Sequence, residues 1–258
     1  MSKVLFINEI FKEKPLIIAG PCAIESREQL SVIAREISKR GLSFVRGGAF
    51  KLRTKHTSFQ GLGEKGLKYL LWACKKYNLK SVSEITCPEQ LGLFKKYVDI
   101  IQVGSRNMFN YELLKVLSKL KKPIILKRGF GATIEEFIEA SRYLTKTNKN
   151  VILCLRGIRT FEYNNASFRN TPDLASILEL KERCGLPVIF DPSHSGGDSK
   201  YVIPLSKAAL VLSADGLLVE VHHSPRRALC DGKQSIDLNQ LDELLMAAEN
   251  LALKKDEI

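Results

Sequence analysis

The sequence has no long apolar run, no paired-cysteine motif and no nucleotide-binding loop, and each absence argues against a class of protein. No stretch approaches the roughly 20 consecutive apolar residues of a membrane-spanning helix. The six cysteines include no CxxC pair, and a cytosolic chain of this size does not depend on disulfides. The Walker pattern GxxxxGK[ST] is missing, which argues against nucleotide hydrolysis.

A secretory leader and an interdomain linker are also missing. The first residues, MSKVLFINEIFKEK, lack a long apolar core and a small-residue cleavage site, so we expect a cytoplasmic protein with no membrane association. No spacer rich in Pro, Ser or Gly divides the chain. We therefore predict a short N-terminal extension over residues 1–14 and a single catalytic domain over residues 15–258.

The formal net charge of +12 has two interpretations. A basic surface can bind nucleic acid or membranes, or the lysines can form a solvated exterior around a site for anionic substrates. Most lysines lie in helical segments such as KKYNLK and KLKK, and no nucleic-acid recognition motif accompanies them. Because charge alone is weak evidence for nucleic-acid binding, we favour the second interpretation.

What the chain does have is a repeated strand–helix pattern over its 258 residues. Apolar runs bounded by Gly and Pro indicate strands buried on both faces. Eight runs fit: Pro15–Cys22, Ser43–Lys51, Leu79–Ile85, Asp99–Asn107, Lys122–Gly129, Asn150–Gly157, Leu186–His194 and Gly216–His222. Helices are predicted between and after them, at Glu25–Lys39, Glu64–Tyr77, Pro88–Tyr97, Tyr111–Leu120, Thr133–Thr145, Pro172–Cys184, Ile203–Leu212 and Leu238–Lys254.

Eight such units form either an open doubly wound sheet or a closed barrel. An open sheet gathers its ligands at one switch point, whereas here reactive residues end nearly every strand. We therefore predict an α/β fold, a single (β/α)₈ TIM barrel, whose active site lies at the C-terminal ends of the strands. The segment Val4–Ile10 is predicted to form a small strand that plugs the opposite end.

Four residues near predicted strand ends have metal-ligand chemistry: Cys22, His194, Glu220 and Asp231. The strands that carry Cys22 and Glu220 are neighbours only if the barrel closes. A thiolate, an imidazole and two carboxylates suit a divalent first-row metal, although the ligand types do not select one. The alternative is that these are unrelated loop residues.

Cationic residues are also concentrated at the predicted strand ends, and together they would repel one another unless an anion lay between them. Arginine suits bidentate phosphate or carboxylate contacts, and lysine adds point charge. We therefore expect substrates that carry phosphate and carboxylate groups. Lys127 could instead be a Schiff-base lysine, but an anion contact is favoured over that role. The candidates are Arg46, Lys51, Arg53, Arg106, Lys127, Arg156 and Arg159.

The motifs, taken in order, resemble a known family. The strings AGPC, RGGAFK-x-RT…SFQGLG, VSEI, VGSRN, LKRG, RGIRTFE, DPSHSGG, VEVH and DGKQS are similar to the 3-deoxy-D-arabino-heptulosonate 7-phosphate (DAHP) synthases. The likeness is to their short microbial branch, which is related to 3-deoxy-D-manno-octulosonate 8-phosphate synthase. The resemblance implies a barrel in homotetramers or dimers that condenses phosphoenolpyruvate with erythrose 4-phosphate, the first step toward chorismate.

The resemblance also assigns roles to residues. It makes Cys22, His194, Glu220 and Asp231 the ligands of a divalent metal, Mn²⁺ first, with Fe²⁺, Co²⁺ or Zn²⁺ as alternatives. Lys51, Cys22 and His194 become the candidate catalytic residues. Phosphoenolpyruvate would be bound by Arg46, Lys51, Arg106, Lys127 and Arg156, together with His194, and the aldose phosphate by Lys51, Arg53 and Thr54.

Substrate choice and departures from the family pattern leave alternatives open. The segment Lys51–Thr54 reads K-L-R-T, nearer to the K-P-R-T of heptulosonate enzymes than to the K-A-N-R of octulosonate enzymes, which use arabinose 5-phosphate. Relative to the family pattern, Leu52 replaces the usual Pro and Leu155 replaces a Glu that is expected near the substrates. The loop Tyr163–Arg169 is also longer than in that pattern. These changes suggest lower activity, which Leu155→Glu should restore, or a catalytically impaired binding subunit.

The cysteine pattern adds one more hypothesis. Cys230 directly precedes the candidate metal ligand Asp231. If the Cys22 and Cys230 sulfurs approach within bonding distance, oxidation would join them in a disulfide and expel the metal.

Overall fold

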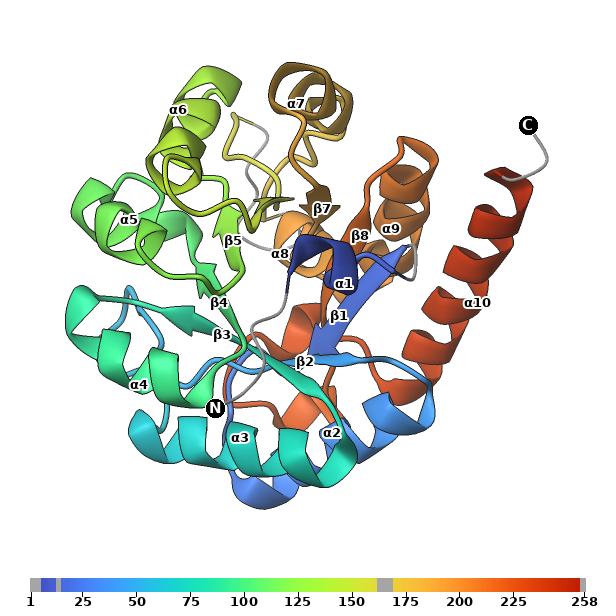
Figure 1. The fold of residues 1–258 in the computed structure, drawn as a ribbon. Helices are drawn as coiled ribbons and strands as arrows, with labels where there is room; N and C mark the ends of the chain where they lie inside the picture. Colours follow the sequence, from blue (N-terminus) through green and yellow to red (C-terminus); the bar gives the residue numbers. More distant parts are fainter. Residues whose placement is uncertain (1–5, 13–14, 162–168, 256–258) are drawn as a thin grey trace.

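Eight parallel strands pair in sequence order and close into a barrel, as predicted (Figure 1). The computed structural model describes residues 6–12, 15–161 and 169–255. Closure is made by β1 and β8, which pair in register from Leu16 with Gly216 to Gly20 with Glu220. The strands are β1 Leu16–Gly20, β2 Phe44–Arg46, β3 Lys80–Ile85, β4 Ile100–Val103, β5 Ile124–Lys127, β6 Val151–Leu155, β7 Val188–Phe190 and β8 Gly216–Glu220.

Helices surround the barrel at nearly the predicted positions. Thr133 and Glu136 form the predicted capping box of α6, because each side chain accepts a hydrogen bond from a backbone N–H that would otherwise be unpaired. The helices are α1 Ile7–Ile10, α2 Arg27–Lys39, α3 Glu64–Tyr77, α4 Leu91–Tyr97, α5 Tyr111–Ser118, α6 Ile134–Thr145, α7 Ser176–Cys184, α8 Pro192–Gly196, α9 Val202–Val211 and α10 Leu238–Lys255.

Several predicted elements differ from the structure. The helix expected from Pro172 begins at Ser176, and the one expected from Pro88 begins as a 3₁₀ turn before α4. The run Ser43–Lys51 is not all strand, because β2 ends at Arg46 and Lys51 lies in the following loop. The run Leu186–His194 is strand only over Val188–Phe190, and Pro192–Gly196 forms the short helix α8.

Strand residues divide between two apolar clusters, as the twofold alternation of β-strands requires. One cluster fills the barrel interior and includes Ile18, Ile125 and Leu218. The other lies between the barrel and its helices and includes Ala19, Leu126 and Val219. The interior cluster ends one layer below the strand C-termini, so the next inward positions are free to carry polar groups.

The N-terminal segment covers the other end of the barrel, but not as a strand. Ile7–Ile10 forms the helix α1, drawn in front of the barrel mouth in Figure 1. Ile10 is buried in the interior cluster, with Ile7 and Phe11 packed against it. A segment with no strand partner gains its backbone hydrogen bonds internally as a helix, and the predicted plug is therefore helical; residues 1–5 of that prediction lie outside the described residues.

None of the helices in the described part of the chain has the length and apolarity needed to cross a membrane.

Candidate active site

A layer of polar side chains closes the interior at the C-terminal ends of the strands. The inward positions at this level are charged or polar on seven strands, and those that continue the strand alternation are Arg46, Glu84, Gln102, Lys127, Arg156, Asp191 and Glu220. On β1 the equivalent position is Gly20, whose φ of +147° is unusual for any other residue. A Cβ there would lie 2.1 Å from the carbonyl oxygen of Arg46, so glycine is required where β1 passes β2.

The four predicted metal ligands meet in this layer. One ligand atom from each of Cys22, His194, Glu220 and Asp231 lies within 4.8 Å of the others. His194 Nε2 is 3.4 Å from Glu220 Oε1 and 3.8 Å from Asp231 Oδ2. Glu220 Oε1 is buried and accepts no hydrogen bond from the described residues. A buried carboxylate oxygen that accepts no hydrogen bond can coordinate a cation, and together with the thiol, the imidazole and the second carboxylate it makes a donor set that fits a divalent metal.

Closure of the barrel brings these ligands together from distant parts of the sequence. The pairing of Gly20 with Glu220 places the turn that carries Cys22 beside the end of β8. His194 lies in α8, which directly follows β7. Asp231 has a left-handed backbone with φ of 53°, a conformation that costs energy in a non-glycine residue and is concentrated at functional sites.

Other side chains hold the ligands in place. Gln234 donates to Glu220 Oε2 at 2.5 Å, and Arg169 donates to Asp231 Oδ1 at 3.3 Å and to Gln234 Oε1 at 2.5 Å. Arg46 Nη1 lies 3.1 Å from Glu220 Oε1 as an ion pair. Partners of this kind orient metal ligands and tune their basicity.

The charges in the cluster keep its carboxylates ionised. Burial opposes ionisation of Glu220, but nearby His194 and Arg46 outweigh it and lower the pKa of that carboxyl. Burial likewise acts against Asp231, yet His194 and Arg169 hold its pKa well below the usual range. Burial lowers the pKa of the His194 imidazole despite the neighbouring acids, which favours the neutral ring that a metal requires.

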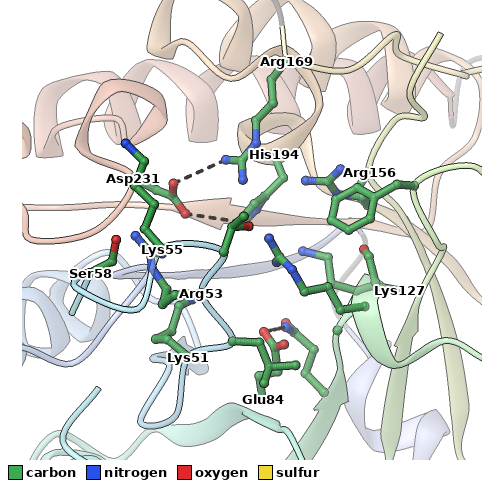
Figure 2. Close-up of a pocket in the computed structure, with 17 residues that line it drawn as sticks. Lys51, Arg53, Lys55, Ser58, Glu84, Lys127, Arg156, Arg169, His194 and Asp231 are labelled. Atoms are coloured by element: carbon green, nitrogen blue, oxygen red, sulfur yellow. Dashed lines mark hydrogen bonds and ion pairs between the residues drawn. The ribbon is translucent and has the colours of Figure 1, made fainter. Parts of the chain in front are cut away.

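A cavity opens beside this cluster, and its wall is strongly cationic (Figure 2). The loop with Lys51 and Arg53 forms one side, and Lys127 and Arg156 form the other. Arg106, Arg169, His194 and Asp231 also line it. The arrangement can hold two anions next to a metal, which would reduce the repulsion among the cations.

Three of the arginines lie over the ring of Phe130. The guanidinium carbons of Arg106, Arg156 and Arg159 lie 5.3, 4.7 and 4.7 Å from its ring centroid. Cations over an aromatic face gain an attraction that partly offsets their mutual repulsion. Burial, followed by the charge of Arg169, still lowers the pKa of Arg156 to about 10, and its Nη1 has no hydrogen-bond partner among the described residues.

Most predicted substrate-binding residues line the cavity. These are Lys51, Arg53, Thr54, Arg106, Lys127, Arg156 and His194. Arg46 is the exception, because it is buried below the cavity and paired with Glu220. The predicted loop Tyr163–Arg169 lies outside the described residues except for Arg169.

The expectation that position 155 lies beside the substrates is wrong for this chain. Leu155 is 1% exposed and belongs to the apolar cluster between barrel and helices. Its neighbour Arg156 takes the direction toward the cavity instead, since successive residues point to opposite faces. The structure therefore gives no support to the expectation that Leu155→Glu raises turnover.

The sequence analysis assigned no role to several residues of the site. Glu84 and Gln102 line the cavity and hydrogen bond to each other at 3.1 Å; polar residues inside apolar strands were an available signal. Asp191 caps α8, and its position before Pro192 is typical of a helix start. Arg169 follows a loop without any periodic pattern, so nothing local marked it.

Comparison with known proteins identifies the family of this chain. The model of the DAHP synthetase I family matches residues 10–255. This chain belongs to that family. It is 47% identical to phospho-2-dehydro-3-deoxyheptonate aldolase of Thermotoga maritima over 92% of this chain and 69% of that protein. It is also 32% identical to 2-dehydro-3-deoxyphosphooctonate aldolase of Desulfatibacillum aliphaticivorans, over 93% of this chain and 92% of that protein.

The fold agrees as well. A crystal structure of the Thermotoga maritima DAHP synthase superposes with a TM-score of 0.87 at 47% identity, covering 92% of this chain and 68% of that chain. The family and the barrel inferred from the motifs are thereby confirmed.

Cys230 lies beside the candidate metal ligands as a second thiol. Its Sγ is 3.1 Å from that of Cys22, and both cysteines are free, so the two sulfurs are near enough for the disulfide hypothesis to be tested. The hydrogen bond with Cys230, together with burial, raises the pKa of the Cys22 thiol, and the same bond lowers the pKa of Cys230. Arg53 Nη1 is 3.0 Å from the Cys230 sulfur. Cys230 is therefore the better nucleophile of the pair.

We expect mild hydrogen peroxide to join Cys22 to Cys230. The two thiols lose two protons and two electrons as the S–S bond forms, and peroxide is reduced to two molecules of water. Peptide mapping should find the cross-linked pair while Cys74, buried in α3, stays a thiol, and bound metal should be lost. A Cys22 thiol that persists after treatment would contradict this expectation.

Proposed function

We propose that this protein condenses phosphoenolpyruvate with erythrose 4-phosphate to give DAHP and inorganic phosphate, in a site that needs a divalent metal. The observation that carries the proposal is a cavity that opens directly onto the four-ligand cluster and is lined by several arginines and lysines, which can bind two anions. Membership of the DAHP synthetase I family and the K-L-R-T loop in the cavity wall support it.

The ligands proposed for the metal are Cys22, His194, Glu220 and Asp231, with Mn²⁺ as the first choice and Fe²⁺, Co²⁺ or Zn²⁺ as alternatives. When bound, the metal supplies a Lewis acid for the aldehyde oxygen of the sugar. Metal binding also requires Cys22 to lose its proton, so affinity should rise with pH.

The chain's own residues bring two mutually repelling anions into contact. Of the residues that line the cavity, we assign Lys127, Arg106 and Arg156 to phosphoenolpyruvate. We assign Lys51, Arg53 and Thr54 to the aldose phosphate. Held in this way, carbon 3 of phosphoenolpyruvate attacks the aldehyde, carbon 2 becomes electron-deficient and takes up water, and phosphate leaves. The cations contribute by orienting the reactants and by stabilising charge on the departing phosphate.

A phosphate-release assay tests this proposal. With Mn²⁺ and phosphoenolpyruvate supplied, phosphate should appear with erythrose 4-phosphate and much more slowly with arabinose 5-phosphate, and not without a sugar. The opposite preference would make the protein an octulosonate synthase. Release with neither sugar would leave a catalytically impaired barrel acting as a binding subunit.

The assembly state is part of the proposal. We propose a homotetramer or dimer, as the family resemblance implies, and sedimentation of the purified protein in the assay buffer would establish which one forms.

A further inference from the structure

Asp191 makes contacts that exceed those of a helix cap. It follows β7 and is fully buried. Its Oδ1 accepts a hydrogen bond from the backbone N–H of His194 at 2.9 Å, which is the ordinary capping contact at the start of α8. A cap needs only this one oxygen, so the contacts of Oδ2 require a separate explanation.

The second oxygen joins two parts of the active site. Asp191 Oδ2 lies 2.8 Å from His194 Nδ1, and it also accepts a hydrogen bond from Lys127 Nζ at the end of β5. Lys127 and Asp191 form an ion pair with both side chains buried. The cationic partner keeps the carboxylate ionised, which leaves Asp191 able only to accept hydrogen bonds.

This contact decides which nitrogen of His194 carries the proton. An ionised carboxylate at Nδ1 requires a proton there, so in the neutral ring Nε2 holds the lone pair. Nε2 is the atom that faces Glu220 and Asp231, at 3.4 and 3.8 Å. The ring is thus presented to the cluster in the tautomer that binds a metal.

We propose that Asp191, kept ionised by Lys127, is a positioning residue that fixes the metal-binding tautomer of His194. The proposal rests on the proposed function, because it assumes that the four-ligand cluster binds a metal. It also ties a residue of the substrate cavity, Lys127, to a metal ligand through one shared carboxylate.

The variant Asp191→Asn separates positioning from capping. Its amide oxygen can still accept from the His194 backbone, but its NH₂ group then faces His194 Nδ1 and Lys127. The ring should respond by moving its proton to Nε2, as an amide donor requires an acceptor at Nδ1. We expect Mn²⁺ affinity to fall by about 10- to 100-fold, the usual effect of losing such a partner.

Two measurements test this, and one needs no metal. Nitrogen-15 NMR of the metal-free protein reports the protonated nitrogen of each imidazole, and the sequence contains only four histidines. The His194 signal, assigned by its loss in His194→Asn, should show the proton on Nδ1 in the wild type and on Nε2 in Asp191→Asn. Titration with Mn²⁺ gives the affinity of each protein.

Asp215→Asn is the matched control. Asp215 also accepts from a lysine, Lys181 at 2.9 Å, and from a backbone N–H, that of Val188 at 2.9 Å. It precedes β8, at the opposite end of the barrel from the site. Its loss should lower the melting temperature without changing the His194 tautomer or the Mn²⁺ affinity.

The outcomes distinguish this inference from the proposed function. Wild-type protein that binds none of Mn²⁺, Fe²⁺, Co²⁺ and Zn²⁺ would overturn the metal requirement, while the NMR measurement would still decide the tautomer. If Asp191→Asn keeps both the wild-type tautomer and the wild-type affinity, Asp191 is only a cap. Should that variant fail to fold, Asp191→Ser takes its place: it retains a capping oxygen but removes the carboxylate from Nδ1, so the His194 proton should no longer be held on Nδ1 and the Mn²⁺ affinity should fall.

Discussion

Replacing Cys22 with alanine should abolish tight Mn²⁺ binding and slow phosphate release by more than roughly a hundredfold. The sulfur is one of four donor atoms within 4.8 Å of one another, and loss of a direct ligand should exceed the 10- to 100-fold effect of losing an outer partner. The remaining imidazole and carboxylates would then bind the metal weakly. Titration with Mn²⁺ and the phosphate-release assay measure the two effects.

A second cysteine provides the control for this variant. Cys74 is also buried, in α3, and Cys74→Ala should keep both metal affinity and activity. Mn²⁺ should raise the melting temperature of the wild type and of Cys74→Ala, because a ligand that binds only the folded state stabilises it. Equal Mn²⁺ affinity in Cys22→Ala and the wild type would show that the sulfur is not a ligand.

Replacing Arg156 with alanine should lower activity and raise stability. Its guanidinium faces the cavity with Nη1 unpaired among the described residues. We expect kcat/KM for phosphoenolpyruvate to fall by about 10²- to 10³-fold, comparable to the loss of one preorganised donor at a reacting group. The phosphate-release assay measures this, and phosphoenolpyruvate should stabilise the variant less than the wild type.

The stability effect follows from the sign of the pKa shift. Burial lowers the pKa of Arg156 to about 10, so the folded state binds this proton less tightly than the unfolded state. The resulting penalty is present in full at neutral pH and is relieved only as pH rises above about 10. Removing the side chain should raise the melting temperature at pH 7 by a few degrees, with part of the gain lost to the cavity it leaves.

Arg159→Ala is the matched control. Arg159 was a candidate anion contact from the sequence, but it is exposed and is not among the residues that line the cavity, although it lies over the same Phe130 ring. It should change neither property appreciably. An Arg156→Ala protein that is less stable than the wild type would mean that other contacts of the Arg156 side chain outweigh the cost of burying its charge.

The barrel and the metal cluster could be predicted because their signals are local and repeated. Each strand is a short apolar run ended by a reactive residue, and reactive residues at nearly every strand end favour a closed barrel over an open sheet. The β1–β8 pairing confirms closure, and it brings the turn with Cys22 beside Glu220. The cavity cations were predictable for the same reason, since parallel strands deliver their ends to one face.

The remaining features depend on tertiary context that the sequence does not express. Leu155 and Arg156 are neighbours in sequence, and only the register of β6 shows which of them faces the cavity. Arg169 reaches Asp231 from a loop with no periodic pattern. Ile7–Ile10 is apolar enough for a strand, but no neighbouring strand pairs with it there, and it forms a helix.

The pairing of the first strand with the last has a consequence for how the protein is made. A ribosome delivers Cys22 long before Glu220 and Asp231, so an incomplete chain holds the thiol without the two acids. Only after β8 docks against β1 do all four donors share one place. If the proposed metal binds there, the full donor set is available to it only after ring closure, because a chain that ends before β8 lacks two of the four donors.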